Sequence, residues 1–211
     1  MSAPKAVPIR VLCVDDHPLV REGISAAITK QPDMLLLGEA ASGREAIDLF
    51  RKYRPDVTLL DLRLPDTSGI DIMIAIRSEF PEARVIILTT FDGDFEIRRA
   101  LEAGARSYLL KSMPPREIVE AIREVHAGKK RIPSEIAAHL AEHFHEDALT
   151  LREIEVLQSI AQGNRNQDVA KKLFITEETV KVHVKHIMEK LGALDRTEAV
   201  AIGVRRGIIK L

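Results

Sequence analysis

The stretch "VTLLD", Val57 to Asp61, is a short run of apolar and β-branched residues that ends in a carboxylate. A run of this length and composition predicts a strand that is buried on both faces of a sheet. Similar runs occur at "VLCV" (Val11–Val14), "LLLG" (Leu35–Gly38), "VIIL" (Val85–Leu88) and "SYLL" (Ser107–Leu110). Amphipathic stretches follow these runs and begin near Leu19, Gly43, Gly69, Gly93 and Pro115. Such an alternation predicts a parallel sheet with helices on both faces.

Residues able to do chemistry follow four of these predicted strands. They are Asp15 and Asp16, Asp61, Thr89 and Lys111. Because the carboxyl ends of the strands form the ligand-binding edge of an open parallel sheet, we expect these side chains to converge on one crevice. Three carboxylates in one crevice repel one another unless a cation lies among them, and all-oxygen ligands suit Mg²⁺. One carboxylate could then attack phosphorus, with Lys111 and Thr89 binding the phosphoryl group.

These strand ends carry a family resemblance. The segments "VDDHPLVREG", "LLDLRLPDTSG", "ILTTFD" and "GARSYLLKSMPP" resemble the receiver domain of two-component response regulators, over about the first 130 residues. The resemblance implies an α/β fold with a flavodoxin-like, doubly wound parallel sheet of five strands. It also implies roles for the matched residues: Asp61 as phospho-acceptor, Asp15 and Asp16 as Mg²⁺ ligands together with Asp61 and the main-chain carbonyl of Arg63, Lys111 as the partner of the phosphoryl group, and Thr89 and Tyr108 as a switch pair.

Two features near the predicted site depart from the receiver pattern. In "KSMPP" the proline comes later than it usually does after the lysine, and Arg63 and Phe91 are bulky neighbours that we expect to tune the access of water. A phosphatase of the haloacid dehalogenase type is the enzymatic alternative, but it needs a second acid where this chain has Arg63. We therefore expect no enzyme activity beyond phosphoryl transfer to the protein itself and slow autodephosphorylation.

The stretch "TVKVHVKH", Thr179 to His186, alternates valine with polar residues as a half-buried strand does. The flanking residues favour a helix instead, since Thr176 is a candidate N-cap and Gly192 a candidate stop. An apolar stripe at helical spacing supports this interpretation: Val180, Val184, Ile187 and Leu191. A strand of about sixteen residues would be far too long.

On this predicted helix, Lys181, Val182 and Lys185 lie on a face turned away from the apolar stripe. In a DNA major groove the lysines could contact phosphates or guanine edges and the valine a thymine methyl group. The alternative is a solvated face with one exposed valine.

The residues upstream predict two further helices. "LTLREIEVLQSIAQG" is typical of a capped amphipathic helix that stops at Gly163, and "NQDVAKKL" of a short helix joined to the next by a tight turn. The expected core residues of the first are Leu151, Ile154, Val156, Leu157 and Ile160. A short helix, a turn and a longer helix with outward lysines form a helix-turn-helix arrangement.

The segment Leu149 to Ile209 as a whole resembles the LuxR-type DNA-binding domain, an all-α helix-turn-helix domain of four helices, most specifically in "TVKVHVKHIMEKLGALDRTEAV". This resemblance implies that Thr179, Lys181, Val182 and Lys185 face DNA, and that a last helix from Arg196 to Arg206 packs against its copy in a second protomer. Gln167 replaces a lysine that is frequent in the family, so the resemblance leaves a phosphate contact at this position open.

Composition agrees with two domains in an ordinary globular protein. The 211 residues are 45% hydrophobic and 30% charged with a net charge of -1, while residues 149 to 211 hold 11 Lys and Arg against 8 Asp and Glu. We expect a receiver domain at 1–128, a linker at 129–148 whose "SEIAAHLAEHFHEDA" forms a helix, and a DNA-binding domain at 149–211. The N-terminus lacks the apolar run of a signal peptide and no long apolar run follows, so we expect a cytoplasmic protein without membrane contact.

The expected function is phosphorylation-controlled transcription regulation, with a sensor histidine kinase, Mg²⁺, double-stranded DNA and a second copy of the chain as partners. The same architecture could also act without a kinase, controlled by its level or by a protein partner, or as a scaffold without DNA function. Two histidine pairs, His183 with His186 and His139 with His143, could offer metal ligands but lack companions. Cys13 is expected to be a small core residue rather than a reactive thiol.

Overall fold

The computed structural model describes residues 7–90, 94–132, 134, 137 and 149–209. The chain divides into two compact units, an α/β unit formed by its N-terminal part and a helical unit formed by its C-terminal part. Each unit is described by itself below. Among the described residues, no helix is long and apolar enough to cross a membrane.

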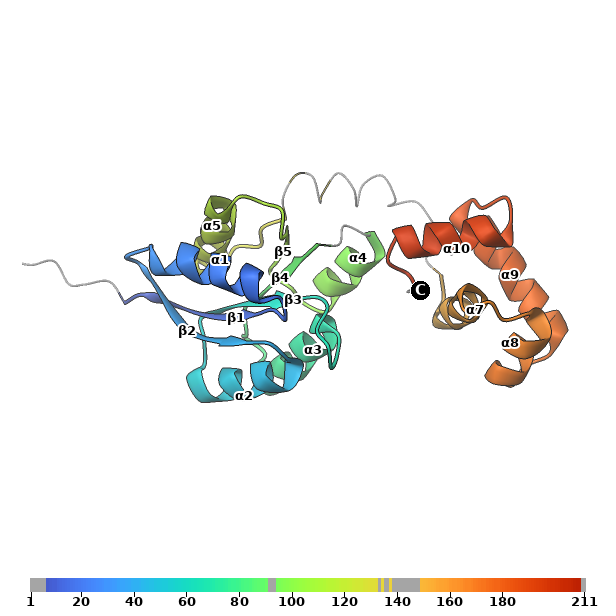
Figure 1. Ribbon diagram of the computed structural model, residues 1–211, viewed down its shortest axis with the longest axis horizontal. Helices are drawn as coiled ribbons and strands as arrows, with labels where there is room; N and C mark the ends of the chain where they lie inside the picture. The colour runs from blue at the N-terminus through green and yellow to red at the C-terminus, as the bar shows by residue number, and fades with distance from the viewer. Residues whose placement is uncertain (1–6, 91–93, 133, 135–136, 138–148, 210–211) are drawn as a thin grey trace, which may run out of the picture. The chain divides into compact units, whose positions relative to one another are not determined.

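The α/β unit is built on one parallel sheet with strand order β2-β1-β3-β4-β5. The strands are β1 (Ile9–Val14), β2 (Met34–Ala40), β3 (Val57–Asp61), β4 (Val85–Thr89) and β5 (Ser107–Leu110). The helices are α1 (Pro18–Thr29), α2 (Gly43–Tyr53), α3 (Gly69–Glu79), α4 (Asp94–Glu102) and α5 (Pro115–His126). In Figure 1, α1 and α5 cover one face of the sheet, and α2 and α3 cover the other. The predicted doubly wound sheet of five strands is confirmed.

Burial on both faces explains the nearly continuous apolar strands. Every residue of β3 and of β4 is buried. One core cluster joins the sheet to α1 and α5 and includes Val11, Leu59, Ile28 and Ile122, all at most 1% exposed. Because helices cover both faces of the parallel sheet, neither face of these strands needs polar side chains.

Strand register brings the carboxyl ends of the central strands level. Val14 pairs with Leu60, and Thr89 pairs with Leu110, so that the residues following β1 and β5 end beside Asp61. The connection after β3 turns sharply, because a Cβ atom on Gly69 would lie 2.1 Å from the carbonyl oxygen of Asp61. Only glycine therefore permits α3 to begin directly against the end of β3.

The helical unit contains α7 (Leu151–Ala161), α8 (Asn166–Leu173), α9 (Glu177–Leu191) and α10 (Arg196–Arg205). Thr150 and Glu153 form a reciprocal capping box at the start of α7, which satisfies two backbone donors. The core of the unit contains Val156, Leu157, Val169, Val180 and Ile187, each at most 1% exposed. Four helices with these bounds confirm the predicted all-α unit.

The prediction that Leu151 belongs to the core of α7 is wrong. Leu151 is 83% exposed, because it is the first residue of the helix and its side chain does not reach the apolar stripe. Ile154, one turn further on, is partly buried and packs against the core as expected.

The stretch Thr179 to His186, in which valine alternates with polar residues, is helical and belongs to α9. Thr176 caps its start by accepting a hydrogen bond from the Thr179 backbone, and Gly192 ends it at a φ of 62°. Val180 is buried, whereas Val182 is 47% exposed. The linker helix expected at residues 134–148 lies almost wholly outside the described residues, so it stays a prediction, as do the domain limits at 128 and 148.

Candidate functional site

An ion triangle lies at the carboxyl edge of the sheet. Lys111, directly after β5, places its Nζ atom 2.7 Å from Asp15 Oδ2 and 2.8 Å from Asp61 Oδ2. The side chains of all three residues are at most 5% exposed. The side chains predicted to converge from β1, β3 and β5 therefore do meet at one place.

Asp16 and His17 complete the acidic edge. The carboxylate of Asp16 is 34% exposed, and His17 Nδ1 lies 2.7 Å from Asp16 Oδ1 and 3.2 Å from Asp15 Oδ1. The backbone N–H of His17 also donates to Asp15 Oδ1 at 2.9 Å. Single ligand atoms of Asp15, Asp16, His17 and Asp61 all lie within 4.8 Å of one another.

The other predicted site residues lie close to this edge in the fold. Thr89 is the buried last residue of β4, and its carbonyl accepts a hydrogen bond from the Lys111 backbone at 2.7 Å. Tyr108 lies on β5 with a side chain that is 0% exposed. The backbone N–H of Arg63 donates to Asp61 Oδ1 at 3.3 Å. Phe91 lies outside the described residues.

Burial and charge act against each other in the triangle. Burial raises the pKa of Asp61 above its usual value, and the Lys111 ammonium group offsets this only in part. Burial would lower the pKa of Lys111, but its hydrogen bonds to Asp15 and Asp61 outweigh that effect and raise it. The lysine therefore stays charged at neutral pH, while burial and the neighbouring Asp15 charge disfavour the ionised form of Asp61.

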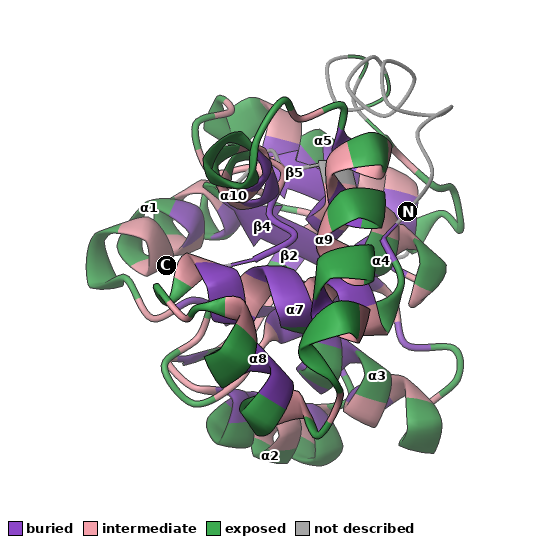
Figure 2. Ribbon diagram, turned by 90° about the vertical axis from the view of Figure 1, so that its right-hand side faces the viewer, coloured by how far each residue is buried: buried purple, intermediate pink, exposed green. Residues whose placement is uncertain are grey.

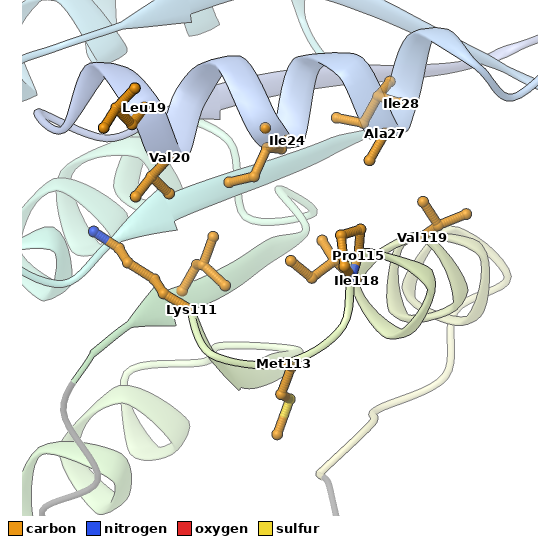
Figure 3. A pocket seen from close by; sticks show the side chains of 12 residues that line it. Leu19, Val20, Ile24, Ala27, Ile28, Lys111, Met113, Pro115, Ile118 and Val119 are labelled. Carbon is orange, nitrogen blue, oxygen red and sulfur yellow. The ribbon is translucent and has the colours of Figure 1, made fainter.

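A small apolar pocket flanks the triangle. It has a volume of about 160 Å³ and lies between α1 and α5, where Val20, Ile24, Ile118 and Val119 contribute to its lining. Figure 3 shows the aliphatic stem of Lys111 along one wall, with its ammonium group turned toward the N-terminal end of α1. The apolar surroundings keep the lysine charge directed at the carboxylates rather than at solvent.

The acidic edge fits a hard divalent cation. Three carboxylates lie there beside one lysine, which pairs with two of them, so the site carries an excess of negative charge and of oxygen donors. Asp16 Oδ1 is buried yet accepts no hydrogen bond from the described residues. An oxygen-rich donor set with an unsatisfied buried carboxylate oxygen is suited to Mg²⁺, with Asp15, Asp16 and Asp61 able to hold it.

The predicted reading face of α9 is exposed. Lys181 and Lys185 extend from it with side chains 54% and 72% exposed, and Thr179 lies in its first turn. Figure 2 shows exposed residues along this helix. Lys181 pairs with Glu178 at 3.1 Å, and Lys185 lies 3.7 Å from Glu189. Exposed pairs of this kind are weak, so they hold neither lysine firmly against the helix.

Two features of the sites were not found from the sequence. The position of His17 beside both acidic residues was one, although its place directly after "DD" was a usable signal. The other is a buried carboxylate of the helical unit, Glu153, whose Oε2 accepts from Lys190 Nζ at 2.8 Å and from the Thr150 backbone at 2.7 Å. The alternative metal role of His183 and His186 gains no support, since the metal-binding group found among the described residues does not include them.

Together, the fold and the two sites define a class of two-domain regulator. An α/β unit carries an acidic cluster and a lysine at its sheet edge, and a helical unit presents a helix-turn-helix. Residues 11–123 match the response regulator receiver domain family, and residues 147–202 match the luxR family of bacterial regulatory proteins.

Relatives of known name support this class along nearly the whole chain. The transcriptional regulatory protein YxjL of Bacillus subtilis is 42% identical, covering 96% of this chain and 98% of its own. The response regulator protein VraR of Staphylococcus aureus is 39% identical, covering 96% and 99%. The solved structure of RcsB from Salmonella enterica serovar Typhimurium, bound to promoter P1flhDC in the presence of the phosphomimetic BeF3−, is 26% identical with a TM-score of 0.72, covering 92% of this chain and 97% of that one.

The chain belongs to the response regulators of the NarL/LuxR type, in which a receiver domain precedes a LuxR-type DNA-binding domain. It is a transcription regulator of a two-component system.

Proposed function

We propose that Asp61 accepts a phosphoryl group from a phosphohistidine of a sensor kinase, and that the modified receiver controls promoter binding by α9. The observation that carries the proposal is the triangle in which Lys111 lies within 2.8 Å of both Asp15 and Asp61, with Asp16 beside them. A buried carboxylate with a raised pKa and a fixed cation at a sheet edge is typical of a functional site.

In the transfer step an Asp61 oxygen attacks phosphorus, a phosphorus–oxygen bond forms, and the phosphorus–nitrogen bond to the kinase histidine breaks. Bound Mg²⁺ would supply charge neutralisation of the phosphoryl oxygens. Lys111 would exchange its contact with Asp61 Oδ2 for one with a phosphoryl oxygen, and Thr89 would offer a hydroxyl donor. Slow hydrolysis then returns inorganic phosphate, and the protein turns over no foreign substrate.

The new charge and acceptor oxygens would draw Thr89 toward the phosphoryl group, and Tyr108 would follow it. Both residues lie on neighbouring strands, β4 and β5, so their motion would reshape the face formed by the fourth and fifth β-α units. We propose that this change controls the arrangement of the two domains and dimerisation on DNA, with α10 packing against its copy.

Labelling with radioactive acetyl phosphate tests the receiver part of the proposal. The wild-type protein is expected to become labelled in the presence of Mg²⁺, and Asp61→Asn is expected to lose all labelling, because an amide is not a nucleophile. Asp56→Asn is a matched control, since that aspartate lies at the opposite end of β3. Labelling of the Asp61→Asn protein at another residue would overturn the assignment.

Titration of duplexes, first selected from a random pool by the phosphorylated protein, tests the DNA-binding part. Lys181→Ala is expected to weaken binding and to reduce the slope of log affinity against log salt by about 1, because one phosphate contact is lost. Lys52→Ala removes the same charge from an exposed position on α2 and should leave the slope unchanged. Equal binding by wild type and Lys181→Ala would show that this lysine does not contact DNA.

Val182→Ala separates base reading from charge. The loss of apolar contact with a thymine methyl group should lower preference for the selected sequence without altering the salt slope. A regulator of the same architecture that works without a kinase would keep these DNA effects and would bind DNA equally with and without the phosphoryl group.

A further inference from the structure

His17 lies in the metal-binding group but has no role in the phosphoryl chemistry proposed above. Its ring is 63% exposed, yet Nδ1 is held 2.7 Å from Asp16 Oδ1 and 3.2 Å from Asp15 Oδ1. Neighbouring ligands of an octahedral ion with bonds of about 2.1 Å lie about 3.0 Å apart. Nδ1 therefore already stands at ligand spacing from two carboxylate oxygens.

His17 Nδ1 contacts both acidic residues: it forms a hydrogen bond with Asp15 Oδ1 at 3.2 Å and lies 2.7 Å from Asp16 Oδ1 in a close polar contact. Asp16 Oδ1 accepts no hydrogen bond from the described residues, even though Nδ1 is only 2.7 Å away. A cation that displaced the hydrogen bond of Nδ1 would find the nitrogen and both carboxylate oxygens at ligand spacing, so the three atoms can serve as ligands of a common ion. The ligand atoms of the group, within 4.8 Å of one another, need to contract by only about half an ångström to reach the spacing of about 4.2 Å between opposite ligands.

The position of His17 in the chain keeps this arrangement in place. His17 is the N-cap residue of α1, and its backbone N–H donates to Asp15 Oδ1 at 2.9 Å. Pro18 follows and fixes the backbone at the first turn of the helix. The ring is thus presented to the acidic edge by backbone that is itself well anchored.

We propose that His17 supplies an imidazole nitrogen to divalent transition-metal ions bound at the acidic edge, so that the site takes Co²⁺, Ni²⁺ or Zn²⁺ through nitrogen as well as oxygen. The proposal rests on the metal site of the proposed function. Imidazole suits these ions, and their affinity for mixed nitrogen and oxygen sites exceeds that of the hard ions, whereas Mg²⁺ gains little from a nitrogen donor. The receiver site would then respond to which divalent metal is present.

Calorimetric titration of the full-length protein with Co²⁺ and, separately, with Mg²⁺ tests the proposal. The measurements use a background in which His139 and His143 are replaced by Gln, so that this second pair of histidines does not take up Co²⁺. His17→Ala is expected to weaken Co²⁺ binding by about 10-fold or more, the scale of lost metal-site contacts, and to change Mg²⁺ binding by less than about 2-fold. The visible absorption bands of bound Co²⁺ should shift with the loss of a nitrogen ligand.

Three further variants make the outcomes distinct. His17→Gln keeps a polar side chain at the N-cap and should reproduce the loss of Co²⁺ affinity, while His126→Ala removes another exposed imidazole of the α/β unit and should leave it unchanged. Asp16→Asn is expected to weaken both ions. If Asp16→Asn weakens both ions but neither His17 variant alters Co²⁺ binding or its spectrum, the inference is wrong and the Mg²⁺ site stands. If Asp16→Asn leaves Mg²⁺ binding unchanged, the metal site of the proposed function fails as well.

Discussion

Each domain of this protein buries a carboxylate against a lysine, and the two carboxylates are perturbed in opposite directions. In the receiver domain, Asp61 contacts Lys111 at 2.8 Å and its pKa is raised by burial. In the DNA-binding domain, Glu153 contacts Lys190 at 2.8 Å. Burial would raise the pKa of Glu153 too, but hydrogen bonds from Lys190 and Thr150 outweigh burial and lower it.

The difference lies in the number of donors that each carboxylate receives. Glu153 Oε2 accepts from Lys190 Nζ, from the Thr150 backbone and from the Thr150 hydroxyl. Asp61 shares its one lysine with Asp15, and the buried carboxylate of Asp15 also repels that of Asp61. A carboxylate with a surplus of donors holds α7 to α9, whereas a carboxylate short of donors is poised to gain a cation or a phosphoryl group.

Replacing each of the two lysines in turn should give the largest difference in the free energy of unfolding between the two sites. Lys111→Met leaves two buried carboxylates without a cation, so we expect the free energy of unfolding to fall by about 3 kcal/mol. Lys190→Met should cost about 1 kcal/mol, because Glu153 keeps its Thr150 donors and Lys190 is 23% exposed. Chemical denaturation followed by circular dichroism measures both, since the chain contains no tryptophan.

Added Mg²⁺ should further separate the stabilities of the two lysine variants. It should restore part of the stability of Lys111→Met, because a cation among the carboxylates replaces the lost ammonium group, and should leave Lys190→Met unchanged. Equal losses in the two variants, with no response to Mg²⁺, would contradict the distinction between the two sites.

Neutralising the carboxylates should give smaller effects of opposite sign. Glu153→Gln weakens a charge-assisted pair and the capping box of α7, so we expect a loss of about 1–2 kcal/mol. Asp61→Asn removes repulsion with Asp15 and should leave stability unchanged or raise it by about 1 kcal/mol. A loss after Asp61→Asn as large as that after Glu153→Gln would show that Asp61 is held as a structural ion pair.

The sequence predicts the receiver site better than it predicts the structural one, for a physical reason. Strand ends of a parallel sheet meet at one edge, so the meeting of Asp15, Asp61 and Lys111 follows from topology alone. The pairing of Glu153 with Lys190 depends on how α7 packs across α9, which helical spacing does not specify. Leu151 shows the same limit, because periodicity places it on the apolar face but the first turn of α7 leaves it exposed.

The smallest expected effect is on the pH dependence of stability: as pH falls, Glu153 and Asp61 should change the free energy of unfolding in opposite directions. The pKa of Glu153 is lowered in the folded state, so the unfolded chain takes up a proton first, and the stability that Glu153 contributes is lost as pH falls below the ordinary glutamate value of about 4.3. The pKa of Asp61 is raised, so the folded state takes up a proton first, and protonation above the ordinary aspartate value of about 3.9 stabilises the receiver domain.

Unfolding free energies of wild type and the two amide variants at a series of pH values measure this divergence. The gap between wild type and Glu153→Gln should close only as pH falls below about 4.3, because wild-type Glu153 stays ionised down to that point. The gap between wild type and Asp61→Asn should close above the ordinary aspartate value of about 3.9, since protonated Asp61 then resembles the neutral asparagine. Carbon-13 titration of the two side-chain carboxyls assigns each change to its group. If the Asp61→Asn gap closed only below about 3.9, or the Glu153→Gln gap closed above about 4.3, the number of donors around each carboxylate would not be what separates the two sites.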